Sequence, residues 1–167
     1  MTTLFTRSTS VAYLLAVILV CYAGIDAQPP TAANSPISTE TTLPSAELLE
    51  PAELVQMLQA SGSDHPLVLQ VGSHILYAEA HIPGSEYAGA GGGEAGLLSL
   101  RERVKTLKKD QFLVIYCGCC PWDRCPNIRP AYQQLHALGF SRVKVLHVAD
   151  NFGSDWVKKG FPVASGR

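Results

Sequence analysis

The sequence lacks an excess of charge of either sign. Its 167 residues include 13 Lys and Arg against 14 Asp and Glu, so the formal net charge is −1. This balance gives no electrostatic basis for binding nucleic acid, and it argues against a disordered acidic or basic tail protein. Apolar residues make up 47 % of the chain, which is enough for one buried core. We therefore expect one folded domain with an appendage.

Several common catalytic signatures are also absent from the sequence. There is no Walker motif, no Ser/His/Asp order and no paired-carboxylate signature. Residues 89–96 include five glycines. They lack the spacing and the preceding strand of a phosphate-binding loop, so we predict a flexible loop there. The interval from Cys117 to Arg124 is longer than cysteine phosphatases use, and Pro121 within it cannot donate a backbone hydrogen bond.

No apolar run in the sequence reaches the roughly 20 residues that a membrane-spanning helix needs. The run at residues 11–23 is short, and Arg7 is the only charge before it. Ala27 then offers a small residue for cleavage. These features predict a signal peptide over residues 1–27, with an uncleaved anchor as the alternative. The protein would be exported, periplasmic or secreted, with no stable membrane span after cleavage.

The rest of the chain divides into a Pro-, Ser- and Thr-rich linker, residues 28–45, and one domain, residues 46–167. Strands that alternate with helices indicate an α/β fold with a central parallel sheet flanked by helices. Apolar periodicity and turn residues predict helices at 51–58, 97–109, 128–138 and 154–159, and strands at 67–71, 112–116 and 142–148.

Residues 112–116 are apolar throughout, as expected for a central strand that is covered on both faces. Ligands of such sheets bind beyond the carboxyl ends of the strands, and Cys117 follows this strand directly. A loop that leads into a helix N-terminus favours a thiolate at Cys117, and the same place would hold an anion. We predict that Gly118, Arg124 and Arg129 bind this anion or substrate.

Four of the five cysteines, Cys117, Cys119, Cys120 and Cys125, lie in this one loop. Export would place them in an oxidising compartment. Three interpretations stay open for the additional cysteines. They could resolve a persulfide on Cys117 or take part in other redox chemistry. All four could bind Zn or Cu as thiolates. A disulfide, for example between Cys120 and Cys125, could brace the loop.

Several segments stand in a characteristic order along the domain. They are the strand 67–71, the turn His81-Ile82-Pro83-Gly84-Ser85, the run Leu113-Val114-Ile115-Tyr116-Cys117, and residues 138–146 and 155–162. In this order and spacing they resemble the rhodanese (sulfurtransferase) domain family over about residues 46–163. The chain departs from the family pattern at Gln70 and Gly72, which replace an Asp and an Arg, and at Arg124, which lies further from the cysteine than usual.

The resemblance implies a single doubly wound domain that acts as a sulfurtransferase without a cofactor. Cys117 would be the nucleophile that takes sulfur from a small donor, such as thiosulfate or a persulfide, and carries it as a persulfide. A thiol acceptor or a redox partner protein would follow. The alternative is a non-catalytic thiol module that binds Zn or Cu, or a redox partner, through residues 117–125.

Overall fold

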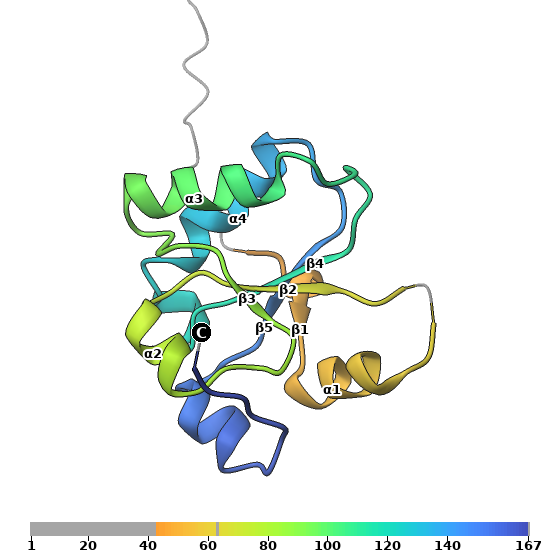
Figure 1. Ribbon diagram of the computed structural model, residues 1–167, viewed down its shortest axis with the longest axis vertical. Coiled ribbons are helices and arrows are strands. Elements are labelled where there is room, and N and C mark those ends of the chain that lie inside the picture. The colour runs from red at the N-terminus through yellow and green to blue at the C-terminus, as the bar shows by residue number, and fades with distance from the viewer. Residues whose placement is uncertain (1–42, 63, 167) are drawn as a thin grey trace, which may run out of the picture. The chain divides into compact units, whose positions relative to one another are not determined.

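The computed structural model describes residues 43–62 and 64–166 (Figure 1). The predicted signal peptide and most of the predicted linker lie outside these residues. Leu43, within the predicted linker, has a buried side chain that joins the core. No helix in the described part of the chain is long and apolar enough to cross a membrane.

A five-stranded parallel sheet forms the centre of the domain. Its strands are β1 (Leu48–Leu49), β2 (Leu67–Gln70), β3 (Glu86–Tyr87), β4 (Leu113–Tyr116) and β5 (Val143–Leu146), in the spatial order β1-β5-β4-β2-β3. In the register of the two central strands, Gln70 is opposite Tyr116. The strands β2 and β4 therefore end at the same edge of the sheet, and the residues that follow them meet there.

Helices cover both faces of this sheet (Figure 1). They are η1 (Ser45–Glu47), α1 (Pro51–Gln59), α2 (His74–Glu79), α3 (Glu94–Val104), η2 (Trp122–Arg124), α4 (Ile128–Ala137) and the π-helix η3 (Gly153–Val157). The helices α3 and α4 pack on one face, and α1 and η3 on the other. The predicted α/β architecture, a doubly wound parallel sheet, is confirmed.

The strand β4 shows why both faces are covered. All four of its side chains are buried. Because successive side chains of a strand point to opposite faces, Leu113 and Ile115 join one hydrophobic core, whereas Val114 and Tyr116 join the other. Burial of each such side chain contributes roughly 1.5–3 kcal/mol, so β4 fixes the position of the cysteine that follows it.

Several short elements and helix boundaries differ from the sequence-based expectation. The strands β1 and β3 have two residues each and α2 has six, too few to show a period in the sequence. The helix predicted at 97–109 is α3, which ends at its buried residue Val104. The helix predicted at 154–159 is the π-helix η3.

Candidate active site

Cys117 leaves the carboxyl end of β4, and a glycine turns the chain there. Gly118 has φ of +84°, in the left-handed region that glycine tolerates best. A Cβ at this position would also stand 3.0 Å from the Cβ of Phe152. The loop then passes through η2, where the N–H of Trp122 donates to the carbonyl oxygen of Val148 at 2.9 Å. It returns to the first cysteine at Cys125, just before α4.

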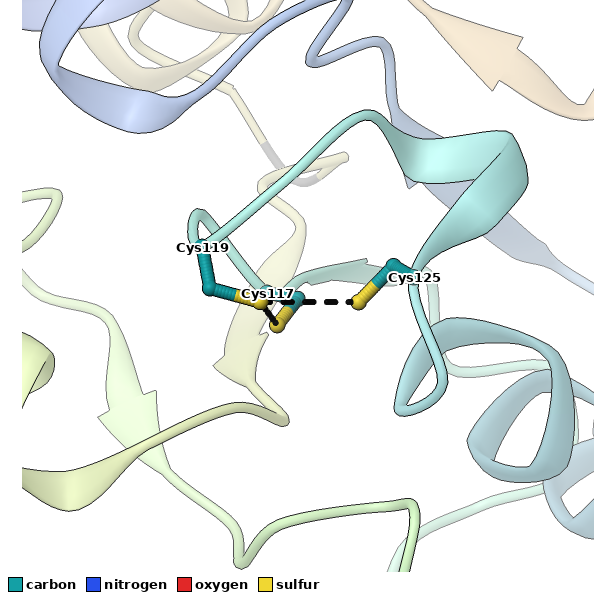
Figure 2. Close-up of side chains that lie close together, drawn as sticks. All are labelled: Cys117, Cys119 and Cys125. Carbon is teal, nitrogen blue, oxygen red and sulfur yellow. Dashed lines mark hydrogen bonds between the residues drawn. The ribbon is translucent and has the colours of Figure 1, made fainter.

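This path brings the cysteine side chains together, as Figure 2 shows for three of them. The sulfurs of Cys117, Cys119 and Cys125 all lie within 4.8 Å of one another. Cys119 is central, because its Sγ is 3.1 Å from that of Cys117, 3.1 Å from that of Cys120 and 4.0 Å from that of Cys125. All four are free thiols; Cys117 and Cys125 are buried, whereas Cys119 is exposed.

Gln70 holds the backbone of Cys117 from the neighbouring strand. Its side chain is 1 % exposed, and its Nε2 donates to the Cys117 carbonyl oxygen at 2.9 Å. Its Oε1 accepts the N–H of Gly72 at 3.1 Å. Both ends of the amide are therefore used, and the ends of β2 and β4 are tied together. Gln70 therefore has a positioning role for Cys117.

Asn127 contacts the sulfur of Cys117 directly. Its Nδ2 donates to Cys117 Sγ at 3.2 Å, and its Oδ1 accepts the N–H of Gly92 at 2.8 Å. The contact with Gly92 fixes which end of the amide faces the sulfur. A nitrogen donor at this place stabilises negative charge on Cys117 or on a sulfur bound to it.

The glycine-rich stretch at 89–96 is packed rather than free. A Cβ at Gly91 would stand 2.3 Å from the carbonyl oxygen of Asn127, and the N–H of Gly91 donates to Val71 at 2.9 Å. Residues 94–96 of the predicted flexible loop belong instead to α3, and the stretch before them is held against the start of α4. Its glycines allow this close approach, which positions Asn127.

The turn at residues 81–85 does not line the cavity beside Cys117, but it forms hydrogen bonds with Tyr116, the residue before this cysteine. The N–H of Ile82 donates to the hydroxyl oxygen of Tyr116 at 3.2 Å, and Ser85 Oγ lies 3.2 Å from the same oxygen. Burial raises the pKa of Tyr116 to about 12, so this hydroxyl stays protonated. His81 is buried, and its ring stacks on Tyr77 with 4.0 Å between centroids.

The pKa values of Cys117 and Cys125 are shifted in opposite directions. The pKa of Cys125 is lowered to about 5, chiefly because the Cys117 thiol donates a hydrogen bond to it. Backbone N–H groups of Asn127 and Ile128, at the start of α4, lower it further, against the opposing effect of burial. The same hydrogen bond to Cys125, together with burial, raises the pKa of Cys117. Of these two residues, Cys125 therefore holds the negative charge, and Cys117 rests as a thiol.

A cavity of about 330 Å³ opens beside Cys117. Its lining comes from the end of β2, from the end of β4 and the loop after it, from α2, and from both ends of η3 and the two residues before it: Gln70, Leu76, Glu79, Ala80, Tyr116, Cys117, Gly118, Cys119, Asn151, Phe152, Gly153 and Val157. Gly118 is thus the predicted anion-binding residue that the structure places in the cavity with the cysteines. Arg124 and Arg129 do not line it.

The two arginines lie elsewhere on the loop. The side chain of Arg124 is 79 % exposed, and its Nε is 4.0 Å from a carboxylate oxygen of Asp123. Arg129 lines a separate small cavity with Leu43, Trp122 and Asp123. Anion binding by these arginines stays a prediction.

Three residues near Cys117 were not identified from the sequence as site residues: Gln70, Glu79 and Asn127. Gln70 carries a weak signal, because it is a polar residue at the end of an apolar strand. Asn127 immediately precedes α4, the usual place of a capping residue, but its side chain serves Cys117 and Gly92 instead. Glu79 carries no signal that distinguishes it from any exposed carboxylate.

Several solved structures are similar in fold to this chain. BH2092 from Bacillus halodurans is 23 % identical, with 70 % of this chain and 75 % of that chain covered and a TM-score of 0.53. The rhodanese-like domain of Alr3790 from Anabaena sp. is 18 % identical, with 71 % and 79 % covered and a TM-score of 0.52.

A third similar structure is EanB, solved as a cysteine persulfide in a tetrahedral intermediate state with ergothioneine. It is 16 % identical, with a TM-score of 0.53, and 72 % of this chain but only 32 % of EanB is covered. No protein-family model and no curated protein matches the chain. At these identities the structures show the fold, and the chain therefore has the rhodanese-like fold.

Proposed function

We propose that this protein is a sulfurtransferase that carries sulfur as a persulfide on Cys117. The observation that supports this most is the place of Cys117. It stands at the carboxyl end of the central strand, beside a cavity of about 330 Å³, with an amide nitrogen 3.2 Å from its sulfur. Substrates of open parallel sheets bind at such strand ends. EanB, which has this fold, was solved as a cysteine persulfide.

The first step adds sulfur to Cys117. The Cys117 sulfur attacks the outer sulfur of a donor R–S–SH while the Cys125 thiolate, whose sulfur lies within 4.8 Å, accepts a hydrogen bond from the Cys117 thiol. The S–S bond of the donor breaks, the Cys117 proton passes to the leaving RS⁻, RSH leaves, and Cys117–S–SH forms. Asn127 Nδ2 stabilises the negative sulfur during this displacement.

The second step releases the sulfur, and Cys119 is placed for it. Its Sγ is 3.1 Å from that of Cys117, which makes it the nearest thiol to the persulfide. Attack of the Cys119 thiolate on the inner sulfur forms a Cys117–Cys119 disulfide and expels HS⁻. A thiol acceptor from solution could instead take the outer sulfur. In the disulfide route a dithiol partner protein returns both cysteines to thiols.

The cellular location of this chemistry depends on the predicted signal peptide, residues 1–27. We propose that the protein is exported, so that the partner that reduces it acts outside the cytoplasm. Expression of the full chain followed by cell fractionation and N-terminal sequencing tests this. A mature N-terminus after Ala27 in the exported fraction is expected. A full-length protein that stays in the cytoplasm would contradict export.

Sulfur transfer is tested by intact-protein mass spectrometry after exposure of the reduced protein to a persulfide donor. The expected product of the first step carries one additional sulfur, and Cys117→Ser takes up none. Cys120→Ser is the matched control, since it removes an adjacent thiol and leaves Cys117 intact. Equal uptake by the Cys117→Ser and wild-type proteins would refute the assignment.

A second candidate function is the binding of a soft metal ion by the same loop. The observation in its favour is that the sulfurs of Cys117, Cys119 and Cys125 lie within 4.8 Å of one another. Zn–S bonds of about 2.3 Å place neighbouring sulfurs about 3.8 Å apart, so the cluster fits Zn²⁺, or Cu⁺, as thiolate ligands. Cys120, 3.1 Å from Cys119, could supply a fourth thiolate.

Metal content distinguishes the two functions. Protein purified under reducing, oxygen-free conditions would hold about one equivalent of Zn or Cu if the loop is a metal site, and chelation would lower its melting temperature. Metal-free protein with the same melting temperature before and after chelation would exclude this candidate.

A further inference from the structure

The cavity beside Cys117 has an unusual charge for a site that takes an inorganic sulfur oxyanion. Among its lining residues, the one charged side chain is Glu79. Lys158 follows Val157 along the chain but does not line the cavity, and Lys159 lines a different one. The loop arginines are also elsewhere. A dianion that enters would lose water and approach a carboxylate without a compensating cation.

The polar side chains of the lining are already paired. The Gln70 amide is used at both ends, by Cys117 and Gly72, and the Tyr116 hydroxyl bonds within the turn below. Asn151 accepts the N–H of Ser154 at 2.9 Å and donates to the carboxylate of Asp150 at 3.0 Å. The side chains thus leave few free donors for oxyanion oxygens. Asp150 adds a second carboxylate close to this edge of the sheet.

The rest of the wall is apolar. Leu76, Ala80, Phe152 and Val157 line the cavity, and Leu76 and Glu79 stand three residues apart on α2, which places them on one side of the helix. A bound molecule would therefore contact an apolar surface and one carboxylate, that of Glu79. This combination suits a small organic group that carries an ammonium.

We propose that the sulfur donor is a small organic persulfide with an amino group, and that Glu79 selects it against thiosulfate. This inference rests on the proposed sulfurtransferase function and names its substrate class. The reaction is Cys117–SH + R–S–SH → Cys117–S–SH + RSH, in which one S–S bond breaks and one forms, and no external oxidant or reductant is needed. Glu79 pairs with the ammonium of R and leaves the sulfur atoms free to reach Cys117.

The test compares three donors on the full, reduced protein: cysteamine persulfide, 2-mercaptoethanol persulfide and thiosulfate. The readout is the rate at which one sulfur is added to Cys117. Cysteamine persulfide is expected to react fastest and thiosulfate slowest, with a difference of about tenfold or more, the order of a partly screened charge interaction near a protein surface. The uncharged donor separates the effect of the ammonium from that of the apolar wall.

Charge reversal at Glu79 assigns the effect to this residue. Glu79→Lys should reduce the preference for cysteamine persulfide over the uncharged donor and accelerate loading by thiosulfate. Glu53→Lys is the matched control, because it makes the same charge change at an exposed position on α1, outside the cavity.

The outcomes separate the choice of donor by Glu79 from the sulfurtransferase function on which it rests. Thiosulfate that loads wild-type protein as fast as cysteamine persulfide would overturn the inference and leave the sulfurtransferase function standing. Equal effects of Glu79→Lys and Glu53→Lys would also overturn it. Loading by none of the three donors would refute the sulfurtransferase function itself.

Discussion

The backbone of Gly72 lies against the sulfur of Cys117. A Cβ at Gly72 would stand 2.6 Å from Cys117 Sγ and 2.8 Å from its carbonyl oxygen. No side chain larger than hydrogen fits at this place without movement of the cysteine. Glycine at position 72 thus allows the end of β2 to form one wall of the cysteine site.

Gly72→Ala should therefore displace Cys117 and slow its loading with sulfur. The added methyl meets a sulfur and a backbone oxygen, so we expect a loss of stability of about 1–3 kcal/mol, as for overpacked cores. Gly62→Ala is the control, since a Cβ there meets nothing within 4 Å. Sulfur uptake and urea unfolding measure the two effects. Wild-type uptake by Gly72→Ala would show that the contact does not position the sulfur.

Gln70→Leu should destabilise the fold more than its size change suggests. The substitution leaves the Cys117 carbonyl oxygen and the Gly72 N–H without their buried partner, which costs about 1–3 kcal/mol for each unsatisfied group. Gln133→Leu makes the same change at an exposed position of α4 and should be nearly neutral. Urea unfolding of both variants is the measurement. Equal stabilities would mean that the Gln70 hydrogen bonds contribute nothing.

The first thiolate of the cluster should form as the pH rises through about 5, because the pKa of Cys125 is lowered to that value. Ultraviolet thiolate absorbance follows this titration, and Cys125→Ser should remove the step. The lowered pKa also stabilises the folded protein. This stabilisation is present above the pKa of an unfolded cysteine, about 8.5, and is lost as the pH falls to about 5.

The advantage in stability of the wild type over Cys125→Ser should therefore grow between about pH 5 and pH 8. Unfolding measured at several pH values tests this dependence. A pH-independent difference, or a first thiolate that appears only near pH 8.5, would show that α4 and Cys117 do not stabilise the Cys125 thiolate.

Asn127→Asp should slow sulfur loading more than Asn127→Ala. The alanine removes the donor 3.2 Å from Cys117 Sγ, and loss of one such donor slows a reaction by about 10²–10³ at most. The aspartate also places a carboxylate beside the developing negative sulfur. The measurement is the pH profile of loading, in which Asn127→Asp should shift the Cys117 step to higher pH. Identical profiles for both variants would remove Asn127 from the chemistry.

The strand and the cysteine loop of this site could be predicted from the sequence, because both depend on local sequence patterns. The uninterrupted apolar run of β4 indicates a strand buried on both faces, and the residue after it must lie at the edge of the sheet. This pattern predicts Cys117 as a site residue. The cysteines of the same loop follow because short sequence separation keeps them close in space.

The supporting residues could not be found in this way, because their contacts join distant parts of the chain. Gln70 and Cys117 are separated by 47 positions, and Gly92 and Asn127 by 35. The charge of the cavity also depends on where the loop arginines point, which their position in the sequence does not determine. Two-residue strands such as β1 and β3 leave no periodic signal at all.

Cys119→Ser should convert a transient persulfide into a stable one. In the wild type, the Cys119 sulfur stands 3.1 Å from Cys117 Sγ, so the proposed second step forms a Cys117–Cys119 disulfide and releases sulfide. Serine at 119 cannot make this attack, and the additional sulfur should remain on Cys117 until an external thiol removes it. Mass spectrometry of the protein and a sulfide assay on the same sample measure both products.

Cys120→Ser is the control for this prediction, because Cys120 is 3.1 Å from Cys119 and is not among the sulfurs grouped around Cys117. It should release sulfide at the wild-type rate, since the attacking pair is intact. If Cys119→Ser released sulfide as fast as the wild type while Cys125→Ser did not, the resolving thiol would be Cys125, and the loop would use this cysteine of lowered pKa as a nucleophile rather than as the hydrogen-bond acceptor of the Cys117 thiol.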